Sequence, residues 1–445
     1  MTTNIRFLYA CVIVKRIGKG NRLRGINKSV WQYLSLLFPV VLLTGMLWNT
    51  AVAQTSQRVY VTNHCSNTVT VIDTATNTIA STITVGNGPY RVAITPDGTR
   101  AYVPNYLSDT VSVINTATNS VVATISVGDS PYDVAITSDG TRAYVTNGDS
   151  NSVSIINTAN NTVIGSISVG ASPRGITFTP DGTRIYVANS DSDNVSVIDT
   201  ATNTVISTVP VGDFPVAIAI IPNGSRAYVT NYFPDSVSLS DPGTVSVIDT
   251  TNNTVIATIP VGVGPELLAI TPDGSRAYVP NIKSNTVSVI NIATNTVIAT
   301  VPVGIFPFGA AISADGTRAY VTIINPGIVS VIDTANNTVI ANAPAGECPF
   351  GIAITPLAQV APNVTIRGRV ESASGRGIFR AMLNLTDGEG NTQTVYTNSF
   401  GYYRFENIVV GRTYNLTIRA KRYDFAPRVL TINEEIKSLN FTAEK

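Results

Sequence analysis

The chain has 445 residues, of which 13% are charged and 44% are hydrophobic, and its formal net charge is +1. Residues 54–356 carry ten basic and twenty acidic side chains, and this balance argues against nucleic acid as a partner. His64 is the only histidine, so a haem site or a histidine-based metal site would have to rest on one residue. We interpret His64 as a solvated loop residue and expect no cofactor.

The first 53 residues have the composition of an export signal. Residues 1–30 contain seven basic and no acidic side chains, residues 34–48 are mostly apolar, and Ala51-Val52-Ala53 is a small-x-small cleavage site. The apolar run is shorter than the roughly 20 residues that span a bilayer. We therefore expect cleavage after Ala53, a mature chain without a transmembrane segment, and a secreted, cell-surface or periplasmic location. An uncleaved anchor is the alternative, and the length of the basic leader leaves an over-extended start site open.

One motif then recurs seven times, and its tyrosines mark the repeats: Tyr60, Tyr102, Tyr144, Tyr186, Tyr228, Tyr278 and Tyr320. The spacing is 42 residues, except for 50 between the fifth and sixth tyrosines. Each repeat has four short runs rich in Val, Ile, Tyr and Thr, with turn signals such as Pro96-Asp97-Gly98 between them. In the second repeat the runs are 89–94, 100–103, 111–115 and 121–127. Four antiparallel strands per repeat predict an all-β protein built of propeller blades.

The two ends of the repeat region predict how the ring closes. The first repeat lacks its innermost strand, and that strand follows the last repeat at residues 349–355. A composite blade therefore closes a seven-bladed propeller over residues 54–356. In the strand register of this blade Cys65 lies opposite Cys348, so we predict a disulfide in an oxidising compartment. Two free thiols are the alternative.

A second domain is predicted after a linker at residues 357–363. Residues 364–445 lack the repeat and carry twelve basic and eight acidic side chains, which reverses the charge balance of the propeller. Their apolar residues alternate in five short runs: 364–370, 381–385, 393–396, 402–405 and 414–418. This pattern is typical of a small β-sandwich.

Two resemblances follow from these motifs. The repeated Tyr-Val-Thr-Asn, Pro-Asp-Gly-Thr-Arg and Val-Ser-Val-Ile-Asp resemble the YVTN family of surface and secreted β-propellers over roughly residues 57–356, with Ile323 replacing the Asn in the last copy. The tail, with Gly368-Arg369-Val370 and residues 398–405, resembles the carboxypeptidase regulatory-like, transthyretin-type sandwich. The first resemblance implies an exported protein and carries no established chemistry. The second implies an accessory, non-catalytic module.

Function is expected where the repeats differ from one another. The pair after each repeated proline varies, and in a propeller these residues begin the innermost strands and ring the mouth of the central channel. The ligand-binding candidates are Tyr90, Arg91, Tyr132, Asp133, Arg174, Glu266, Phe308 and Phe350. Aromatic faces beside charged groups suit a small polar or sugar-like ligand. Neutral drift at a tolerant position is the alternative.

The eight-residue insertion in the fifth repeat is a second candidate. Tyr232 and Phe233 are predicted to be exposed and able to anchor a partner, and a tolerated loop is the alternative. Aspartates occupy loops of the same face: Asp149, Asp191, Asp193, Asp235 and Asp241. Oxygen-rich loops can take calcium, but no EF-hand spacing occurs, and we predict no metal site.

The sequence thus favours an exported, non-catalytic interaction or structural protein with a monomeric propeller. One face of the ring would bind a protein or carbohydrate at the cell surface, and the sandwich would be an accessory or adhesive module. No enzyme is expected, because histidine is nearly absent and Asp133 and Glu266 lie three blades apart. The alternative is a propeller enzyme, similar to lactonases or lyases, or a redox-associated propeller, with its ligand at the channel mouth.

Overall fold

The computed structural model describes residues 57–233, 241–356, 363–388, 390–410, 412–432 and 434–444. The predicted export signal, most of the predicted linker, and Asp235 in the insertion lie outside the described residues. Within the described ranges, no helix is long and apolar enough to cross a membrane.

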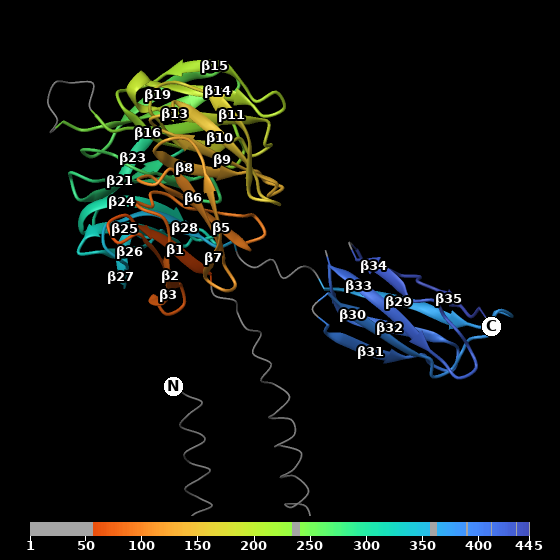
Figure 1. Cartoon of the computed structure of the whole chain (residues 1–445). Helices are drawn as coiled ribbons and strands as arrows, with labels where there is room; N and C mark the ends of the chain where they lie inside the picture. The colour runs from red at the N-terminus through yellow and green to blue at the C-terminus, as the bar shows by residue number, and fades with distance from the viewer. Residues whose placement is uncertain are drawn as a thin grey trace, which may run out of the picture. The chain divides into compact units, whose positions relative to one another are not determined.

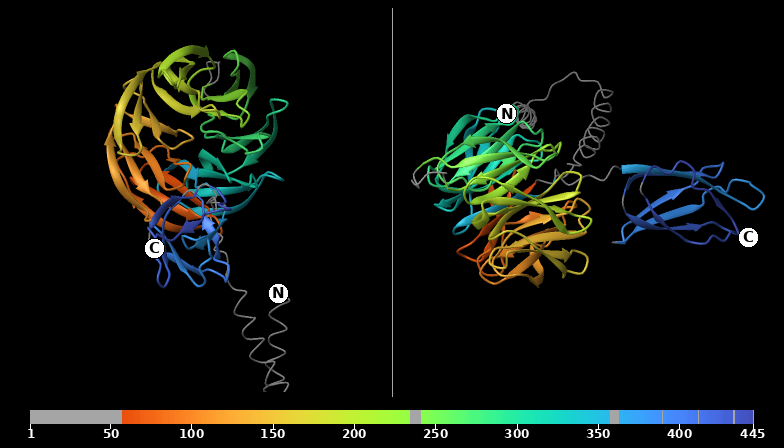
Figure 2. Two further views of the ribbon diagram at one scale, coloured as in Figure 1. Left: turned by 90° about the vertical axis from the view of Figure 1, so that its right-hand side faces the viewer. Right: turned by 90° about the horizontal axis from the view of Figure 1, so that it is seen from above.

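Seven four-stranded antiparallel sheets surround a central axis (Figure 1, Figure 2). The innermost strands are β28 (Pro349–Ile354), β4 (Ala93–Ile94), β8 (Pro131–Ile136), β12 (Pro173–Phe178), β16 (Pro215–Ile220), β20 (Ala269–Ile270) and β24 (Ile305–Ile312). The second strands are β1 (Arg58–Asn63), β5 (Arg100–Asn105), β9 (Arg142–Asn147), β13 (Arg184–Asn189), β17 (Arg226–Asn231), β21 (Arg276–Asn281) and β25 (Arg318–Asn325). The third strands are β2 (Thr68–Asp73), β6 (Thr110–Asn115), β10 (Ser152–Asn157), β14 (Asn194–Asp199), β18 (Thr244–Asp249), β22 (Thr286–Asn291) and β26 (Ile328–Asp333). The outermost strands are β3 (Thr78–Thr84), β7 (Ser120–Ser126), β11 (Thr162–Ser168), β15 (Thr204–Pro210), β19 (Thr254–Pro260), β23 (Thr296–Pro302) and β27 (Thr338–Pro344).

We number the sheets in this order as blades 1 to 7. Each innermost strand contacts the innermost strand of the next blade, and β28 contacts β4, so the ring is closed. The second and third strands are buried almost along their whole length, because each blade is covered on both faces by its neighbours. A short 3₁₀ turn, η1 (Ser190–Ser192), is the one helical element of the described propeller.

Hydrogen bonds from the repeated tyrosines join one blade to the next. In six blades the tyrosine hydroxyl donates to the Oδ1 of an asparagine that turns between the third and fourth strands of the following blade. The bonds join Tyr60 to Asn119 at 2.9 Å, Tyr102 to Asn161 at 3.1 Å, Tyr144 to Asn203 at 3.0 Å, Tyr186 to Asn253 at 2.6 Å, Tyr228 to Asn295 at 2.7 Å and Tyr278 to Asn337 at 2.8 Å. These asparagines have φ between 51° and 58°, a left-handed conformation that asparagine tolerates. The exception is Asn77 in blade 1, whose buried Oδ1 has no hydrogen-bond partner.

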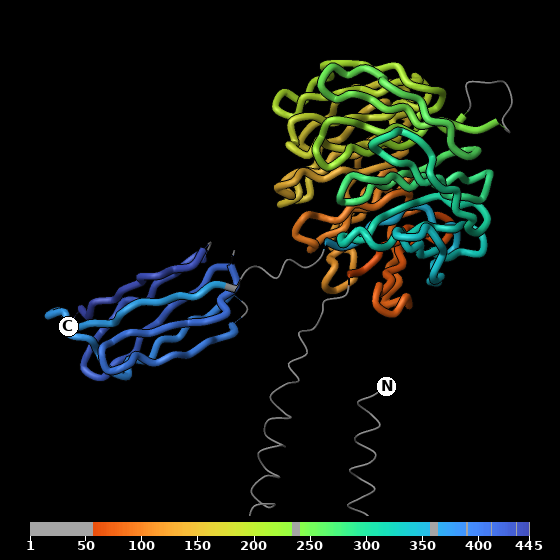
Figure 3. The backbone as a smooth tube through the Cα atoms, turned by 180° about the vertical axis from the view of Figure 1, so that it is seen from behind, coloured from red at the N-terminus to blue at the C-terminus, as the bar shows by residue number. Residues whose placement is uncertain are grey.

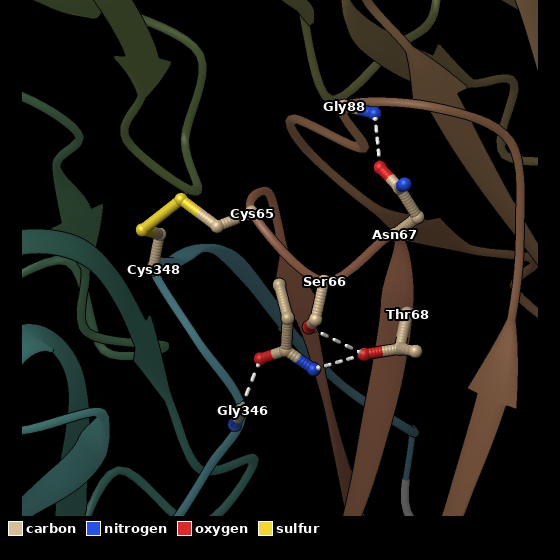
Figure 4. The surroundings of a disulfide bond; sticks show 8 residues. Cys65, Ser66, Asn67, Thr68, Gly88, Gly346 and Cys348 are labelled. Atoms are coloured by element: carbon tan, nitrogen blue, oxygen red, sulfur yellow. Dashed lines mark hydrogen bonds between the residues drawn. A yellow bond between two sulfur atoms is a disulfide. The ribbon is translucent and has the colours of Figure 1, made fainter.

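Blade 1 is built from both ends of the propeller sequence, as predicted. Strand β28 pairs antiparallel with β1, and the tube trace shows these two segments side by side (Figure 3). The predicted disulfide between Cys65 and Cys348 is present, with their Cα atoms 5.5 Å apart (Figure 4). The backbone amide of His64 also donates to the carbonyl of Cys348 at 3.0 Å. Covalent and hydrogen bonds therefore close the ring at the same point.

Two innermost strands are shorter than the sequence suggested. Strand β4 covers two residues rather than the predicted run 89–94, and β20 is equally short. In both blades the Thr of the repeated motif is a proline, Pro104 or Pro280. In blades 1, 3 and 7 this Thr accepts a hydrogen bond from the innermost strand, as Thr62 does from the amide of Gly351 at 2.8 Å. Proline has no N–H group to donate to the innermost strand, so the ladder is interrupted at this point.

The C-terminal domain is a β-sandwich of a three-stranded sheet, β32-β29-β35, and a four-stranded sheet, β31-β30-β33-β34. Its strands are β29 (Asn363–Glu371), β30 (Met382–Asp387), β31 (Thr392–Tyr396), β32 (Tyr402–Val409), β33 (Thr413–Arg419), β34 (Arg428–Thr431) and β35 (Phe441–Thr442). Leu383, Phe405 and Leu416 are fully buried between the sheets. The sequence analysis missed β34 and β35, because both are too short to show an alternating pattern.

The hydrogen bonds between blades predict that replacing Tyr228 and replacing Tyr320 by phenylalanine will reduce stability to different extents. Tyr228→Phe removes the hydroxyl that bonds Asn295 and leaves a part-buried acceptor unpaired, so we expect a loss of about 1–2 kcal/mol in the free energy of unfolding. Tyr320→Phe should cost less, because no hydrogen bond from Tyr320 reaches Asn77 across the seam between blades 7 and 1. Denaturant unfolding of the two variants measures the difference, and equal losses would contradict it.

The disulfide predicts a redox-dependent stability. Cys65→Ser with Cys348→Ser should lower the free energy of unfolding by about 2–5 kcal/mol, because the bridge closes a very long loop of the unfolded chain. The oxidised wild type treated with a reductant should unfold like the double variant. A reductant-insensitive unfolding midpoint in the wild type would count against a stabilising bridge.

Candidate functional site

The ligand candidates from different blades meet at the channel mouth. The ring of Tyr90 in blade 2 lies 4.8 Å from that of Tyr132 in blade 3, 5.8 Å from that of Phe308 in blade 7 and 5.2 Å from that of Phe350 in blade 1. These positions begin the innermost strands, which converge on the axis (Figure 2). The structure thus brings together side chains that are up to 260 residues apart in sequence.

His64 belongs to this aromatic group, and its interpretation as a solvated residue is wrong. Its ring stacks on Phe350 at 4.7 Å with an angle of 14° between the planes, and Phe350 stacks on Phe308 at 4.4 Å. The imidazole is half-buried and its Nδ1 has no hydrogen-bond partner. Burial lowers the pKa of His64, which favours the neutral ring at neutral pH. The adjacent disulfide restricts the loop that carries this histidine, which explains why it does not extend into solvent.

Arg91 and Asp133 form a buried ion pair that ties four blades together. Each residue is 8% exposed, and Nη1 of Arg91 bonds Oδ2 of Asp133. The other terminal nitrogen of Arg91 donates to the carbonyl of Val216 in blade 5 at 2.9 Å. Asp133 also accepts from the backbone amides of Val134 at 2.8 Å and Ile176, in blade 4, at 3.2 Å. With these partners both groups have a structural role beneath the mouth.

Arg174 lies between two aromatic rings. The carbon of its guanidinium is 4.6 Å from the ring centre of Tyr132 and 4.6 Å from that of Phe214. Its Nε is buried and has no hydrogen-bond partner, and Arg174 forms no ion pair within the described residues. The positive charge is therefore held by cation–π contacts and can still accept an anionic group.

Glu266 is the carboxyl group of the mouth that has no partner. The residue is 7% exposed, and its side chain forms neither a hydrogen bond nor an ion pair among the described residues. Its backbone is fixed, because its amide donates to Pro280 at 3.0 Å and its carbonyl accepts from Thr230 at 2.7 Å. Burial raises the pKa of Glu266 to about 7, although the charges of Arg174, Arg91 and Lys283 oppose the shift. This carboxyl can take up and release a proton near neutral pH.

The phenols beside Glu266 stay protonated. Burial raises the pKa of Tyr132 to about 12 and also raises the pKa of Tyr90. Both hydroxyl groups therefore remain neutral hydrogen-bond donors at physiological pH. They can orient a ligand but cannot act as bases there.

The aromatic residues of the insertion are less exposed than predicted. Tyr232 and Phe233 are half-buried, and their rings lie 6.1 and 5.1 Å from that of Phe214. The Nζ of Lys283 lies 4.9 Å from the ring centre of Tyr232. This cluster therefore forms a wall of the mouth beside Arg174, and residues 234–240 of the insertion lie outside the described residues.

The aspartates of this face have structural partners where they are described. Asp149 accepts from the hydroxyl of Ser130 at 2.6 Å, and Asp193 accepts from the amide of Phe214 at 2.9 Å. Asp191 follows in η1, and Asp241 lies near the end of the insertion. Within the described ranges no group of three or more His, Cys, Asp or Glu side chains could hold a metal ion.

Surface hollows lie at the opposite ends of the innermost strands. Three of them, of about 400 to 510 Å³, are formed by the Pro-Asp-Gly turns of neighbouring blades. They are lined by structural arginines, such as Arg184, which donates to the carbonyl of Thr250 at 2.9 Å. None of the three is lined by Glu266 or Arg174, so they are separate from the channel mouth.

Several residues of the site were not predicted from the sequence. Tyr106 and Lys283 follow the repeated Asn and Phe214 directly precedes the repeated Pro, so a comparison of the pair after each proline did not select them. One signal was available: Pro104 and Pro280 replace the repeated Thr in the two blades that provide Arg91 and Glu266. The replacement of Thr by Pro in the repeated Tyr-Val-Thr-Asn motif therefore distinguishes blades 2 and 6, which contribute these two ionisable groups.

Three family models match parts of the chain. A model described as lactonase, 7-bladed β-propeller, matches residues 49–163 and 74–209. A choice-of-anchor I domain model matches residues 146–310, and a carboxypeptidase regulatory-like domain model matches residues 365–444. The chain is therefore a seven-bladed β-propeller followed by a carboxypeptidase regulatory-like domain, and both expectations of fold are confirmed.

Individual proteins are similar over the propeller. A candidate 6-phosphogluconolactonase from Bacteroides uniformis is 16% identical, with a TM-score of 0.57 over 67% of this chain and 99% of that one. Another, from Bacteroides fragilis, is 14% identical, with a TM-score of 0.57 over 69% and 99%. At these identities the likeness shows the fold. The PE-PGRS family protein PE_PGRS18 of Mycobacterium tuberculosis is 60% identical over 38 residues, which span only 8% of either chain.

These findings overturn the expectation of a non-catalytic interaction or structural protein. The match to the lactonase propeller model favours the enzymatic alternative. Three blades separate Asp133 and Glu266 around the ring, but this separation does not keep their surroundings apart. Arg91 of blade 2 pairs with Asp133, reaches the Val216 carbonyl of blade 5 and still lowers the pKa of Glu266.

The buried ion pair predicts an asymmetry between single and double replacements. Asp133→Ala leaves the Arg91 charge buried and unpaired, so we expect the free energy of unfolding to fall by about 3–5 kcal/mol. Arg91→Met combined with Asp133→Leu should cost less, because neither charge then remains buried. Thermal or denaturant unfolding compares the two. A double variant less stable than Asp133→Ala would contradict a purely structural pair.

Proposed function

We propose that the propeller is a hydrolase that opens a lactone at the channel mouth, with Glu266 as the general base. The observation that carries the proposal is the buried, unpartnered carboxyl of Glu266, whose pKa is raised to about 7. The match to the lactonase propeller model supports the choice of a cyclic ester as the substrate class.

Each group at the mouth has a distinct role in this proposal. Ionised Glu266 takes a proton from water while the water oxygen attacks the lactone carbonyl. Arg174 faces the developing oxyanion, because its guanidinium has no ion pair within the described residues. The ring C–O bond then breaks, and protonated Glu266 returns its proton to the leaving alkoxide. The sum of the steps is lactone plus water giving a hydroxy acid.

Asp133 is not the base of this reaction. Its carboxylate is bound to Arg91 and to two backbone amides, whereas the side chain of Glu266 has no partner among the described residues. The neutral phenols of Tyr90 and Tyr132 supply hydrogen bonds to the substrate. The stacked rings of His64, Phe308 and Phe350 exclude water from one side of the mouth.

We place this activity outside the cytoplasm, in a secreted, cell-surface or periplasmic protein. The support is the composition of residues 1–53 and the disulfide of blade 1, which persists in oxidising compartments. The proposed reaction uses side chains and water.

The role of Glu266 predicts a pH profile. A general base acts only when ionised, so kcat/KM for a lactone that the protein hydrolyses should fall about tenfold per unit as pH drops below 7 and level off above it. A screen of sugar and alkyl lactones, corrected for spontaneous hydrolysis, identifies the lactone. Glu266→Gln should reduce kcat by a factor of about 10²–10⁴.

The propeller offers a matched control, because its only other glutamate, Glu347, is exposed. Glu347→Gln should retain wild-type activity and the same pH profile. A Glu266→Gln variant as active as Glu347→Gln would refute the proposed base. No hydrolysis of any lactone would refute the substrate class.

A further inference from the structure

Three large aromatic side chains are exposed at one end of the C-terminal sandwich. Phe379 is 62% exposed, Phe400 is 69% exposed and Tyr402 is 56% exposed. Other aromatics of the domain, such as Phe405 and Phe441, are buried in its core. Large apolar side chains exposed at one end of a domain commonly mark a binding surface.

The segments that carry these rings run side by side. The amide of Arg380 donates to the carbonyl of Thr397 at 3.1 Å, and the amide of Ala381 donates to the Thr397 hydroxyl at 2.8 Å. Gly377 packs so closely on the loop of Phe400 that an added Cβ would lie 2.0 Å from the Phe400 carbonyl oxygen. Residues 376–380 and 398–402 therefore form one continuous surface, which we call the aromatic end.

The backbone of the aromatic end is held rigidly. The Oδ1 of Asn398 accepts from the amides of Phe400 at 2.9 Å and Tyr402 at 3.0 Å. Nε of Arg369 donates to the carbonyl of Phe400 at 3.0 Å, and its guanidinium lies 5.6 Å from the ring centre of Tyr402. A ligand would pay little ordering entropy in this turn, because the aromatic side chains are already presented on a fixed backbone.

The charge of the aromatic end points to an acidic ligand. Arg376 and Arg380 are exposed and form no ion pair within the described residues. The whole tail carries twelve basic and eight acidic residues, opposite in sign to the propeller. Free guanidinium groups bind carboxylate or sulfate in two parallel hydrogen bonds, and aromatic faces accept the C–H face of a sugar ring.

We propose that the aromatic end of the sandwich binds an acidic polysaccharide and so tethers the propeller to it. The argument for a polysaccharide is the charge of this surface, since Arg376 and Arg380 form no ion pair within the described residues and lie beside exposed rings. The proposal rests on the sandwich alone. It therefore stands or falls separately from the lactone hydrolysis assigned to the propeller.

Binding of the secreted full chain to defined polymers tests the proposal. Affinity electrophoresis is run with polygalacturonate and with its fully methyl-esterified form, and in parallel with dextran sulfate and dextran. We expect retardation by the acidic polymers, weakening as salt rises, and at least tenfold weaker retardation by the neutral ones. Equal binding to the esterified or unsulfated polymers would overturn the acidic specificity. No binding to either acidic polymer would overturn the proposal and leave a protein partner as the surviving explanation.

Variants locate the binding surface. Phe379→Ala with Phe400→Ala, and separately Arg376→Gln with Arg380→Gln, should each weaken binding at least tenfold. Val429→Ala is the control, because Val429 is 74% exposed and belongs to β34, at the opposite edge of the four-stranded sheet from β31. All replaced side chains are exposed, so the unfolding midpoint and lactone hydrolysis should not change. Undiminished binding by both double variants, or an equal loss in Val429→Ala, would overturn the assignment.

Discussion

The hydrogen bond between a tyrosine of one blade and an asparagine of the next is the constraint on which the propeller depends. The tyrosine is fully buried between blades, where an unpaired hydroxyl would be costly, and the asparagine adopts a left-handed turn that places its Oδ1 opposite that hydroxyl. Both residues recur in every repeat. Six such bonds fix the rotation of each blade on its neighbour. The seventh junction lacks this bond but keeps another that recurs between blades, in which Nη1 of Arg318 donates to the carbonyl of Thr74 at 3.2 Å.

Because the blades are fixed to one another in this way, the innermost strands can depart from regular pairing without loss of the ring. The prolines at 104 and 280 interrupt the innermost pairing of blades 2 and 6, and these blades supply Arg91 and Glu266. Burying a charged group raises the free energy of the folded state, and the structure offsets this differently at each ionisable residue. Arg91 and Asp133 are paired, Arg174 lies between aromatic rings, and Glu266 has a raised pKa that favours its neutral form. Glu266, whose side chain has neither a hydrogen bond nor an ion pair among the described residues, is the member of this set that can take up and release a proton.

Much of this architecture could be predicted from the sequence because the repeat supplies its own comparison. The blade count, the composite blade and the pairing of Cys65 with Cys348 all follow from period and register. The channel-mouth residues also followed, since they vary where the scaffold does not. What could not be predicted depends on distances across the ring. Three features depend on contacts between residues of different blades: the burial of His64, the hydrogen bond from Arg91 to Val216 and the raised pKa of Glu266. Strand periodicity contains no information about such contacts. The expectation of a non-catalytic protein was wrong partly because the separation of Asp133 and Glu266 around the ring was treated as a separation in space. Its other ground was the scarcity of histidine.

The most direct test of the account is the ionisation of Glu266 itself. Glutamate carboxyl groups labelled with ¹³C can be titrated by NMR in the wild type and in Glu266→Gln, which assigns the missing resonance. The account predicts one glutamate carboxyl that titrates near pH 7 and whose resonance disappears in the variant. If the Glu266 resonance instead titrates in the ordinary range of a glutamate carboxyl, the channel mouth has no base poised for catalysis and the central claim is contradicted.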